Sequence, residues 1–394
     1  MAQATAIRLT GDDLRLEDVW AVAYQGATAE LADEAHGRMA AARELVERSA
    51  GESHHVYGVN TGFGRFVSRS IPEELAEELQ VRLLRSHACG VGEPYPDEIV
   101  RAAMLLRANA LAKGFSGARI ATVELLVECL NRGVLPHVPS RGSVGASGDL
   151  APLAHLALPL IGEGEAWVDG RRLPGAEALA AAGLEPVRLQ AKEGLSLVNG
   201  TQFMAAYGAI GLLRAQRLAK VADLACALSL EALQGSRTSF FPQIHAVRPL
   251  RGQMASAANV LHLLEASAIN EAHRWCDQVQ DAYSLRCAPQ VHGACRDLLD
   301  YANYTVSTEL NSATDNPLVL IEDERVVGRR VQLGAHGVVD VIEEVAAGAV
   351  HLRGAAQRVG VLNLVAPAMS LVDRGLFEQL QHVRGRVDLT PQRT

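Results

Sequence analysis

The sequence predicts a mainly α protein, built as a long-helix bundle with a smaller mixed N-terminal part. Long stretches with helical apolar spacing and no proline fill much of the second half, whereas strand-like segments are few and short. We expect an N-terminal domain over residues 1–200, which carries a glycine-rich loop, and a central bundle of long helices over residues 201–394. No internal repeat or low-complexity tract divides the chain further.

The first hundred residues alternate short strands, helices and turns. A strand-like start at 6–9 precedes helical sequence at 28–49. The segment "YGVNTGFGRF" (57–66) is rich in turn residues. Helices are expected to begin at Pro72 and Pro96, because proline followed by acidic residues suits the first turn of a helix.

Before residue 201, the sequence also predicts where the second of these helices ends, a β-hairpin and a short helix. Gly114 is expected to end the helix that begins at Pro96. The segment "EAWVDGRRL" (165–173) predicts a β-hairpin with Asp169 and Gly170 at its turn, followed by a short helix.

The second half predicts long helices, and the first of them has apolar residues on more than one face. Such helices belong inside a bundle or between subunits, because a helix at the surface keeps one polar face. The expected helices cover residues 201–233, 254–281, 292–311 and 337–361.

Charge and composition exclude several classes of function. The net charge of −8 gives no basic field for nucleic acid or for an acidic membrane, so a small polar substrate fits better. Six cysteines without CxxC spacing suggest reduced thiols, and the histidines form no convincing metal set. The start of the chain has no signal-peptide core, and no apolar run reaches the roughly 18 residues of a membrane helix. We therefore expect a cytoplasmic protein.

The loop "RGSVGASGDL" (141–150) does not match three familiar glycine-rich motifs. It lacks the Gly-Lys-Ser/Thr of a P-loop, and its last glycine comes one place early for a nucleophile elbow. Its helical surroundings do not fit the βαβ unit of a dinucleotide site. Taken by itself, the loop fits a flexible connection between two helices.

A different chemistry explains why Ala146, Ser147 and Gly148 are all small. If the Gly148 nitrogen attacks the Ala146 carbonyl, a five-membered ring closes, and loss of the Ser147 hydroxyl leaves an exocyclic methylene. Alanine and glycine leave room for that closure, and glycine permits unusual backbone angles. The product would be a strong electrophile made from the chain itself.

Six segments, in order and spacing, resemble the aromatic amino acid ammonia-lyases, and among them most closely the histidine-specific members. The resemblance covers roughly residues 10–320. It rests on "YGVNTGFG" (57–64), "RSHACGVG" (85–92), "GSVGASGDLAPLAH" (142–155), "KEGLSLVNGTQ" (192–202), "VQDAYSLRCAPQV" (279–291) and "NSATDNPLV" (311–319).

The resemblance implies a carbon–nitrogen lyase that eliminates ammonia from L-histidine to give urocanate. The electrophile would be 4-methylideneimidazol-5-one, formed from Ala146, Ser147 and Gly148, with no metal or nucleotide. The family assembles as a homotetramer whose sites draw residues from three subunits. Electrophile attack on the substrate amine and attack on its ring both remain open.

The resemblance also implies roles for single residues. Tyr57 would be the base, which needs a pKa below its free value of about 10 or an alkaline optimum. Asn199 would form hydrogen bonds with the carbonyl of the prosthetic ring or with the substrate amine. Without the resemblance, it would be interpreted as a turn residue before Gly200. Arg286 would clamp the substrate carboxylate, although by itself it reads as a solvated arginine at a helix end.

Four further residues complete the predicted site. Tyr283 and Gln280 resemble residues that contact or flank the substrate, and Asn316 lies in a segment that the family uses near the site. His87 bears on specificity, because a histidine there can face a polar substrate ring, as in the histidine and tyrosine lyases.

The resemblance weakens after about residue 320. The family's Gly-Asn-Phe-His segment is replaced by "VVGRRVQLGAHGVVD" (326–340), and the chain ends at Thr394, short of the usual family length. Two alternatives therefore stay open beside the histidine lyase. One is a tyrosine ammonia-lyase or aminomutase with the same prosthetic group, and the other is a non-catalytic truncated paralogue.

Overall fold

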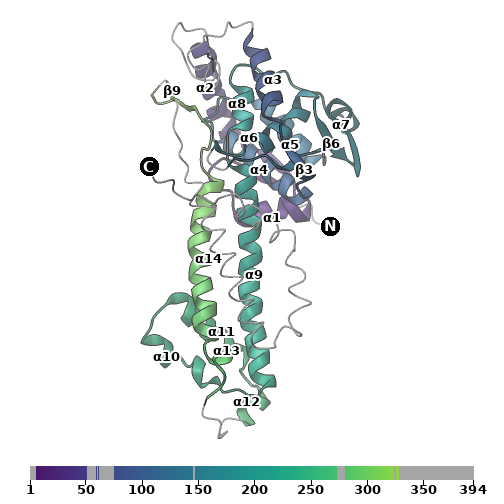
Figure 1. The fold of residues 1–394 in the computed structure, drawn as a ribbon. Helices are drawn as coiled ribbons and strands as arrows, with labels where there is room; N and C mark the ends of the chain where they lie inside the picture. The colour runs from purple at the N-terminus through teal and green to yellow at the C-terminus, as the bar shows by residue number, and fades with distance from the viewer. Residues whose placement is uncertain are drawn as a thin grey trace, which may run out of the picture. The chain divides into compact units, whose positions relative to one another are not determined.

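The structure is a computed structural model that describes residues 6–50, 59, 61, 75–144, 147–272, 280–323 and 325–327. It is mainly α with few strands, as the sequence predicts (Figure 1). The chain divides into two compact units, one of Met1–Gly211 with Tyr304–Val338, the other of Leu212–Asn303 with Val339–Thr394. The predicted domain boundary between residues 200 and 201 stays a prediction.

The first unit holds most of the short elements. Its helices are α1 (Leu16–Gln25), α2 (Asp33–Ala50), α3 (Ala76–His87), α4 (Asp97–Ala112), α5 (Ile120–Asn131), α6 (Leu150–Ala157), η4 (Leu158–Ile161), α7 (Gly175–Ala181) and α8 (Glu193–Val198). Its strands are β1 (Ile7–Leu9), β2 (Ala29–Leu31), β3 (Val91–Pro94), β4 (Leu135–Pro136), β5 (Pro139–Arg141), β6 (Glu165–Val168), β7 (Arg171–Pro174), β8 (Leu318–Leu320) and β9 (Arg325–Val327).

Helix α4 forms the core of the first unit. It is buried along almost its whole length, and it contacts α1, α2 and α5. The acidic residues Asp97 and Glu98 follow Pro96 at its start, where the helix dipole favours negative charge. Gly114 follows the helix with a φ of +86°. The predicted start and end of this helix are confirmed.

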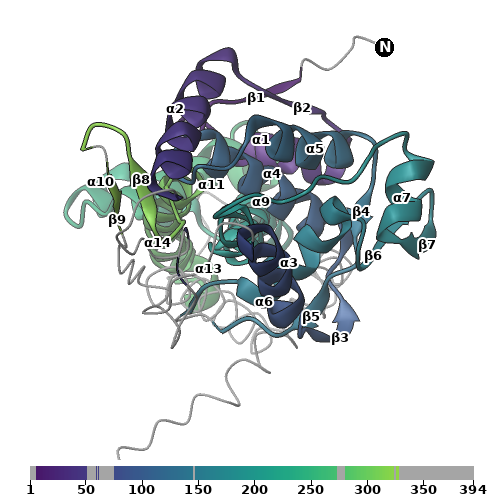
Figure 2. The same ribbon diagram turned by 90° about the horizontal axis from the view of Figure 1, so that it is seen from above.

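The strands form small separate sheets. The β6–β7 hairpin turns at Asp169 and Gly170, as predicted, and β4 extends it to three strands beside α7 (Figure 2). Strand β1 pairs in parallel with β2, so the prediction of helix from residue 28 is wrong for its first residues. The chain stays extended at Ala29–Leu31 because it pairs with β1, and α2 begins only at Asp33.

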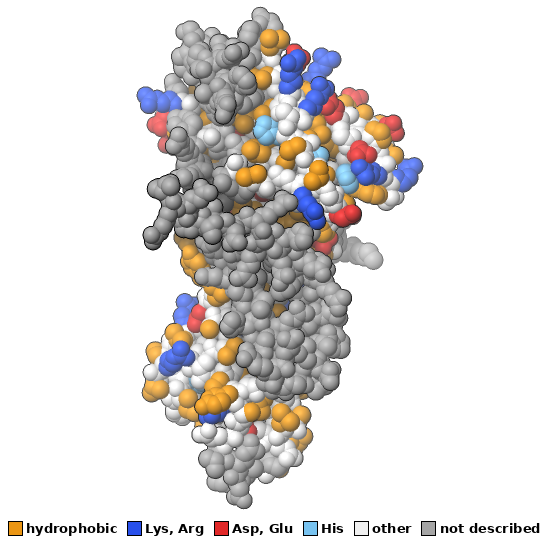
Figure 3. All heavy atoms as spheres, in the orientation of Figure 1, with side chains coloured by type: hydrophobic (Ala, Val, Ile, Leu, Met, Phe, Trp, Pro, Cys, Tyr) orange, Lys and Arg blue, Asp and Glu red, His pale blue; other side chains and the backbone are white. Residues whose placement is uncertain are grey.

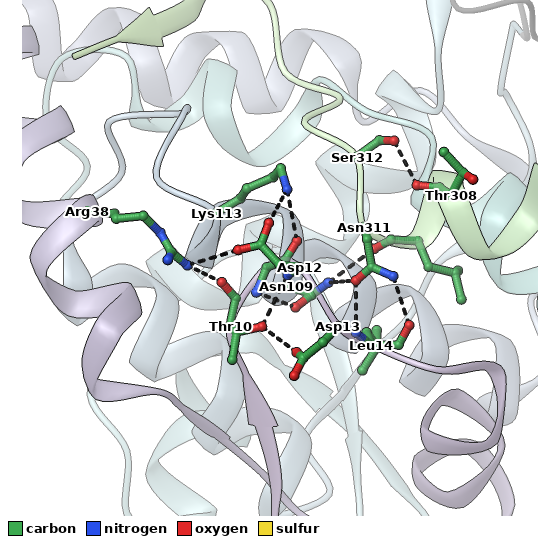
Figure 4. A network of polar contacts seen from close by, with 12 residues as sticks. Thr10, Asp12, Asp13, Leu14, Arg38, Asn109, Lys113, Thr308, Asn311 and Ser312 are labelled. Carbon is green, nitrogen blue, oxygen red and sulfur yellow. Dashed lines mark hydrogen bonds and ion pairs between the residues drawn. The ribbon is translucent and has the colours of Figure 1, made fainter. Parts of the chain in front are cut away.

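A polar network fastens the returning segment of the first unit to its N-terminal residues (Figure 4). The Asn311 side chain accepts a hydrogen bond from Leu14 N (2.9 Å) and donates to Leu14 O (2.8 Å). On α4, Asn109 accepts from Gly11 N (2.9 Å) and donates to Leu310 O (3.1 Å). Asn109 and Asn311 therefore hold the start of residues 310–316 against the core of the unit. This segment is distant in the sequence from both α4 and the N-terminal residues that it contacts.

The second unit is built on long helices. It contains α9 (Gln202–Ala232) from Leu212 onward, η5 (Arg237–Phe240), α10 (Pro242–Ala246), α11 (Arg251–Leu263), α12 (Ala268–Ala272), α13 (Tyr283–Arg286) and most of α14 (Ala288–Leu310). The predicted helices at 201–233 and 292–311 are confirmed as α9 and α14. The single helix predicted at 254–281 is wrong, since α11 ends at Leu263 and Ala266 has a φ of +61°. The helix predicted at 337–361 lies outside the described residues.

Three helices of the second unit meet at the buried carboxylate of Asp223 on α9. It accepts hydrogen bonds from Ser256 Oγ (2.6 Å) and Asn259 Nδ2 (3.1 Å) of α11. From α14 it is contacted by His292 Nδ1 (2.9 Å) and Arg296 Nη2. Burial acts against its charge, but these hydrogen bonds hold the pKa of Asp223 below its usual value. An ionised carboxylate therefore ties α9, α11 and α14 into a bundle.

The surface of the second unit carries exposed apolar side chains (Figure 3). Val221, Leu224 and Leu228 are 41%, 45% and 58% exposed, and their spacing places them on one face of α9. Among the described helices, none is long and apolar enough to cross a membrane.

Candidate functional site

The loop between β5 and α6 makes a tight turn at Ser147 and Gly148. Ser147 N donates to Val144 O (2.8 Å), and Val144 forms an antiparallel bridge with Gly148. Gly148 has a φ of +88°, which glycine adopts readily, and Ser147 is exposed. The turn is compatible with the predicted ring closure. The third member, Ala146, lies outside the described residues.

The carboxylate of Asp149 fixes the C-terminal end of this loop. It is 3% exposed and accepts hydrogen bonds from Ser143 Oγ (2.8 Å) and from Met204 N (2.9 Å) in the first turn of α9. The Asp149 backbone N–H donates to Gly200 O (2.7 Å). Burial raises the pKa of Asp149, and the hydrogen bonds it accepts act in the opposite direction. Through this one residue the loop is joined to the turn that precedes α9.

Asn199 lies at the end of α8, in the turn that Asp149 contacts. Its Nδ2 donates to Asn316 O (2.9 Å), and its carbonyl accepts from Nη1 of the buried Arg107 (2.7 Å). A Cβ added to Gly148 would lie 2.7 Å from Gly200 O, so the loop packs directly against this turn. The predicted residues Ser147, Gly148 and Asn199 therefore belong to two segments in contact.

His87 is brought toward the same loop by strand pairing. It is the last residue of α3, and its Nδ1 lies 3.0 Å from Leu83 O within that helix. Beyond it, β3 pairs with β5, with Val91 opposite Arg141 at the base of the loop. The four segments 85–92, 142–155, 192–202 and 311–319 thus come together in the first unit.

His155 of α6 strengthens the connection between the His87 segment and the loop. Its Nε2 accepts a hydrogen bond from Gly90 N (3.0 Å), so this nitrogen carries no proton. Burial lowers the pKa of His155 below its ordinary value of 6.5, with a smaller contribution from His137. The imidazole is therefore held neutral.

An aromatic cluster lies beside the Asp149 carboxylate. The Tyr95 ring centroid is 4.8 Å from that of Phe203 and 5.7 Å from that of Tyr207, both on α9. Burial raises the pKa of Tyr95, and the negative charge of Asp149 adds to the shift. Tyr95 is accordingly a neutral packing group here.

Buried ion pairs hold α8, whose last residue precedes Asn199. Lys192 is fully buried and binds Asp315 Oδ2 (2.8 Å) and Ser116 O (2.8 Å). Glu193 is fully buried as well and accepts from Arg119 (2.7 Å). The helix that ends at Asn199 is therefore anchored by opposite charges at its start.

Sequence reasoning missed Arg107, Asp149 and Lys192 as parts of this site. Asp149 and Lys192 lie in two of the family-like segments, and Arg107 and Asp149 each stand as a charged residue in an apolar run, as in "MLLRANALA" (104–112) and "GDLAPLAHL" (148–156). Such a residue must find a partner when the run is buried. The partners lie in segments that are distant in the sequence, so the pattern does not identify them.

Three of the remaining predicted residues of the site belong to the second unit. Gln280, Tyr283 and Arg286 belong to the second unit, where Tyr283 is 73% exposed and the Arg286 guanidinium lies 3.9 Å from its ring centroid. This is a cation–π contact. Tyr57 lies outside the described residues. In the part of the chain that the structure describes, no group of three or more His, Cys, Asp or Glu side chains could hold a metal ion.

The sequence of the chain matches a known protein family. The sequence model of the family described as "Aromatic amino acid lyase" matches residues 14–359. The histidine ammonia-lyase of Gloeobacter violaceus is 57% identical over 319 residues, which cover 81% of this chain and 62% of that protein. The chain thus spans less than two thirds of the length of this relative.

Solved structures share the fold. The histidine ammonia-lyase of Trypanosoma cruzi has a TM-score of 0.82 and 39% identity, with coverage of 90% of this chain and 67% of that one. The tyrosine aminomutase of Streptomyces globisporus has a TM-score of 0.83 and 35% identity, with coverage of 90% and 70%.

Proposed function

The chain belongs to the aromatic amino acid lyase family, and from this we propose that it eliminates ammonia from L-histidine to give urocanate. The observation that carries the proposal is the 57% identity to a histidine ammonia-lyase over 81% of the chain. In this reaction a base removes the β-proton, the Cα–N bond breaks, and a C=C bond forms as ammonia leaves. Cytoplasmic location remains a prediction.

The residues at the loop fit the self-derived prosthetic group of this family. Gly148 has the backbone freedom that ring closure needs, Ser147 is exposed, and Asn199 lies on the adjoining turn. We assign Ala146, Ser147 and Gly148 to 4-methylideneimidazol-5-one, with Asn199 to hold it. When formed, this group supplies an electrophile that withdraws electrons from the bound substrate.

The other predicted residues bind and deprotonate the substrate in this proposal. Tyr57 takes the β-proton, Arg286 binds the carboxylate in the two-pronged manner of a guanidinium, and His87 faces the imidazole. Gln280 and Tyr283 line the substrate's position. Because the family is expected to build each site from several subunits, Arg286 and Asn199 need not come from one chain.

A homotetramer is part of the proposal. The apolar face of α9 formed by Val221, Leu224 and Leu228 supports it, because exposed apolar residues in helical register favour contact with another helix. The partner would be a second copy of this chain.

Tyrosine aminomutase or lyase activity is the second candidate, favoured by the fold similarity to the Streptomyces globisporus enzyme. The lower identity of 35% with that enzyme, against 57% with a histidine ammonia-lyase, places it second.

The deciding experiment compares the full chain with its Ser147→Ala variant. We expect the purified protein to have lost two waters by intact mass and to release ammonia from L-histidine with formation of urocanate. The variant should keep its full mass and lose activity by ~1,000-fold or more, equivalent to about 4 kcal/mol. Ser140→Ala, on the neighbouring strand β5, is the matched control and should behave as the parent protein.

Three results would redirect the proposal. Products from L-tyrosine and none from L-histidine would favour the second candidate. A parent protein with the mass of two lost waters but no activity on either substrate would favour a non-catalytic paralogue. An active Ser147→Ala variant would rule out the self-derived electrophile.

A further inference from the structure

Arg107 is a fully buried cation in the middle of α4, among apolar neighbours. Its Nη1 donates two hydrogen bonds, to Asn199 O (2.7 Å) and to the side-chain Oε1 of Gln202 (2.9 Å). Asn199 is the residue at the end of α8, and Gln202 is the first residue of α9. A single guanidinium nitrogen therefore holds both ends of the turn that connects the two helices.

The turn packs so closely on Arg107 that Gly200 has no room for a side chain. A Cβ added to Gly200 would overlap both Gln202 Oε1 and Arg107 Nη1. The Asn199 carbonyl is also one of the last carbonyls of α8, which have no partner inside the helix. A cation at this helix end is favourable because the helix dipole is negative there.

The rest of the guanidinium is costly to bury. Arg107 Nε and Nη2 are buried and have no hydrogen-bond partner within the described residues. Burial also lowers the pKa of Arg107 to about 10, against the stabilising charge of Asp315. An apolar side chain of similar size would avoid these costs, since burial of a charge without full hydrogen bonding is unfavourable. The arginine is therefore better explained by what Nη1 holds than by the stability of the core.

Two further bonds show what depends on the orientation of this turn. The Asn199 side chain donates to Asn316 O, and Gly200 O accepts from Asp149 N (2.7 Å) at the end of the Ala-Ser-Gly loop. Arg107 binds the carbonyl of the Asn199–Gly200 peptide, so a shift of that peptide would displace the Cα of Asn199, which carries the side chain, and the Cα of Gly200, whose own carbonyl contacts Asp149.

We propose that Arg107 is a positioning residue for the lyase site, which acts through the Asn199–Gly200 peptide and sets the Asn199 amide relative to the Ala-Ser-Gly loop. It touches neither substrate nor reacting atoms. The proposal rests on the function proposed above, and it gives α4 an indirect part in the site, through the turn that Arg107 holds.

The test uses Arg107→Lys and Arg107→Gln in the full chain, with Arg43→Lys as the matched control. Arg43 is another buried arginine of the first unit, and its Nη1 donates to Ala191 O (2.9 Å), a carbonyl that precedes α8. The readouts are kcat and KM for L-histidine, intact mass for ring formation, and deuterium exchange of the peptide that covers residues 196–206.

We expect Arg107→Gln to lower kcat by about tenfold to a hundredfold, the effect of losing the hydrogen bond from the charged guanidinium to the Asn199 carbonyl, with a smaller change in KM. Exchange at residues 199–202 should rise in the same variant. Arg107→Lys keeps the positive charge and N–H donors but loses the planar guanidinium, so it should recover part of both effects. The Arg43→Lys control should leave kcat and the exchange of this peptide near the parent values.

Two outcomes would overturn the proposal. The first is a folded Arg107→Gln protein whose kcat and exchange match those of Arg43→Lys. The second is failure of both Arg107 variants to fold, which would make Arg107 a residue of the core alone.

The exchange measurement separates this proposal from the proposed function. A parent protein that forms no ring and releases no ammonia contradicts the function. In that case, faster exchange at residues 199–202 in the Arg107 variants would still show that Arg107 holds the turn.

Discussion

At the scale of residues, the candidate site depends on two glycines in contact. Gly148 has a left-handed backbone, and a side chain there would meet Gly200 O at 2.7 Å. Gly200 is itself closed in by Gln202 and Arg107. The Ala-Ser-Gly loop and the Asn199 turn approach each other this closely because neither glycine carries a side chain.

We predict that Gly148→Ala disrupts the site more than its backbone strain alone explains. A left-handed alanine costs about 1–3 kcal/mol, and contact with Gly200 O must also push the two segments apart. Ring formation, measured by intact mass, should fall together with activity. The control is Gly133→Ala, where φ is +71° and a Cβ would meet nothing within 4 Å. Equal ring formation in both variants would contradict this explanation.

The neutral His155 predicts a loss of stability in acid. Its pKa lies below 6.5 in the fold, so the unfolded chain binds more protons once the pH falls below that value. The contribution of His155 to the free energy of unfolding is therefore fully present well above pH 6.5 and is lost as the pH falls through its lowered pKa. Protonation also removes the acceptor for Gly90 N.

Denaturant unfolding between pH 7 and pH 5 tests this prediction. His155→Gln should show a shallower dependence on pH than the parent protein, because glutamine can accept a hydrogen bond and does not titrate. His262→Gln is the control, since the side chain of His262 is 78% exposed. A parent protein with a flat profile over this range would show that His155 is not held neutral.

At the scale of elements, α8 is short but every residue of it is buried. Six helical residues have little intrinsic stability, so their position depends on tertiary contacts. The contacts are the Lys192–Asp315 pair and the Glu193–Arg119 pair at the start of the helix. Asp315 also accepts a hydrogen bond from the backbone N–H of Asn316 (2.7 Å). One carboxylate therefore contacts both the start of α8 and the segment that carries Asn316.

Asp315→Asn should destabilise the chain strongly. The variant leaves the Lys192 ammonium buried without an opposite charge, and breaking such a pair costs about 3–5 kcal/mol. The control is Glu78→Gln, which removes the partner of Arg82 in an exposed pair with side chains 53% and 68% exposed. The control should cost less than about 1 kcal/mol. A similar midpoint of urea unfolding for both variants would contradict the prediction.

Sequence periodicity predicted the long elements well because their signals are local. Helices α4, α9 and α14 and the β6–β7 hairpin follow from apolar spacing, prolines and a turn dipeptide. The break after Leu263 and the strand β2 were missed, since both depend on contacts with other segments. The site shows the same limit. The Ala-Ser-Gly loop is visible in the sequence, but Arg107 meets Asn199 across 92 positions.

At the scale of the whole molecule, the chain returns to its first unit after building most of the second. Asn311 and Asn109 fasten the returning segment, and Asn316 then meets Asn199. The second unit presents the apolar face of α9 at Val221, Leu224 and Leu228. Under the homotetramer proposed above, we expect copies of the chain to associate through that face.

Charge on this face should weaken association. The double variant Leu224→Glu and Leu228→Glu places two carboxylates where apolar contact is expected, so sedimentation should show a smaller assembly than the parent chain forms. Leu263→Glu, a change at a 45% exposed leucine of α11, is the control and should leave the assembly intact. An unchanged assembly in the double variant would show that this face of α9 is not part of the interface.

The hydrogen bond from Asn199 to Asn316 has a consequence for synthesis on the ribosome. The Ala-Ser-Gly triplet leaves the exit tunnel long before its neighbour's anchor has been translated. A nascent chain that stalls before Asn316 therefore lacks the hydrogen-bond acceptor of the Asn199 side chain. Under the proposed function, we therefore expect the prosthetic group to form only after this distant segment has been made.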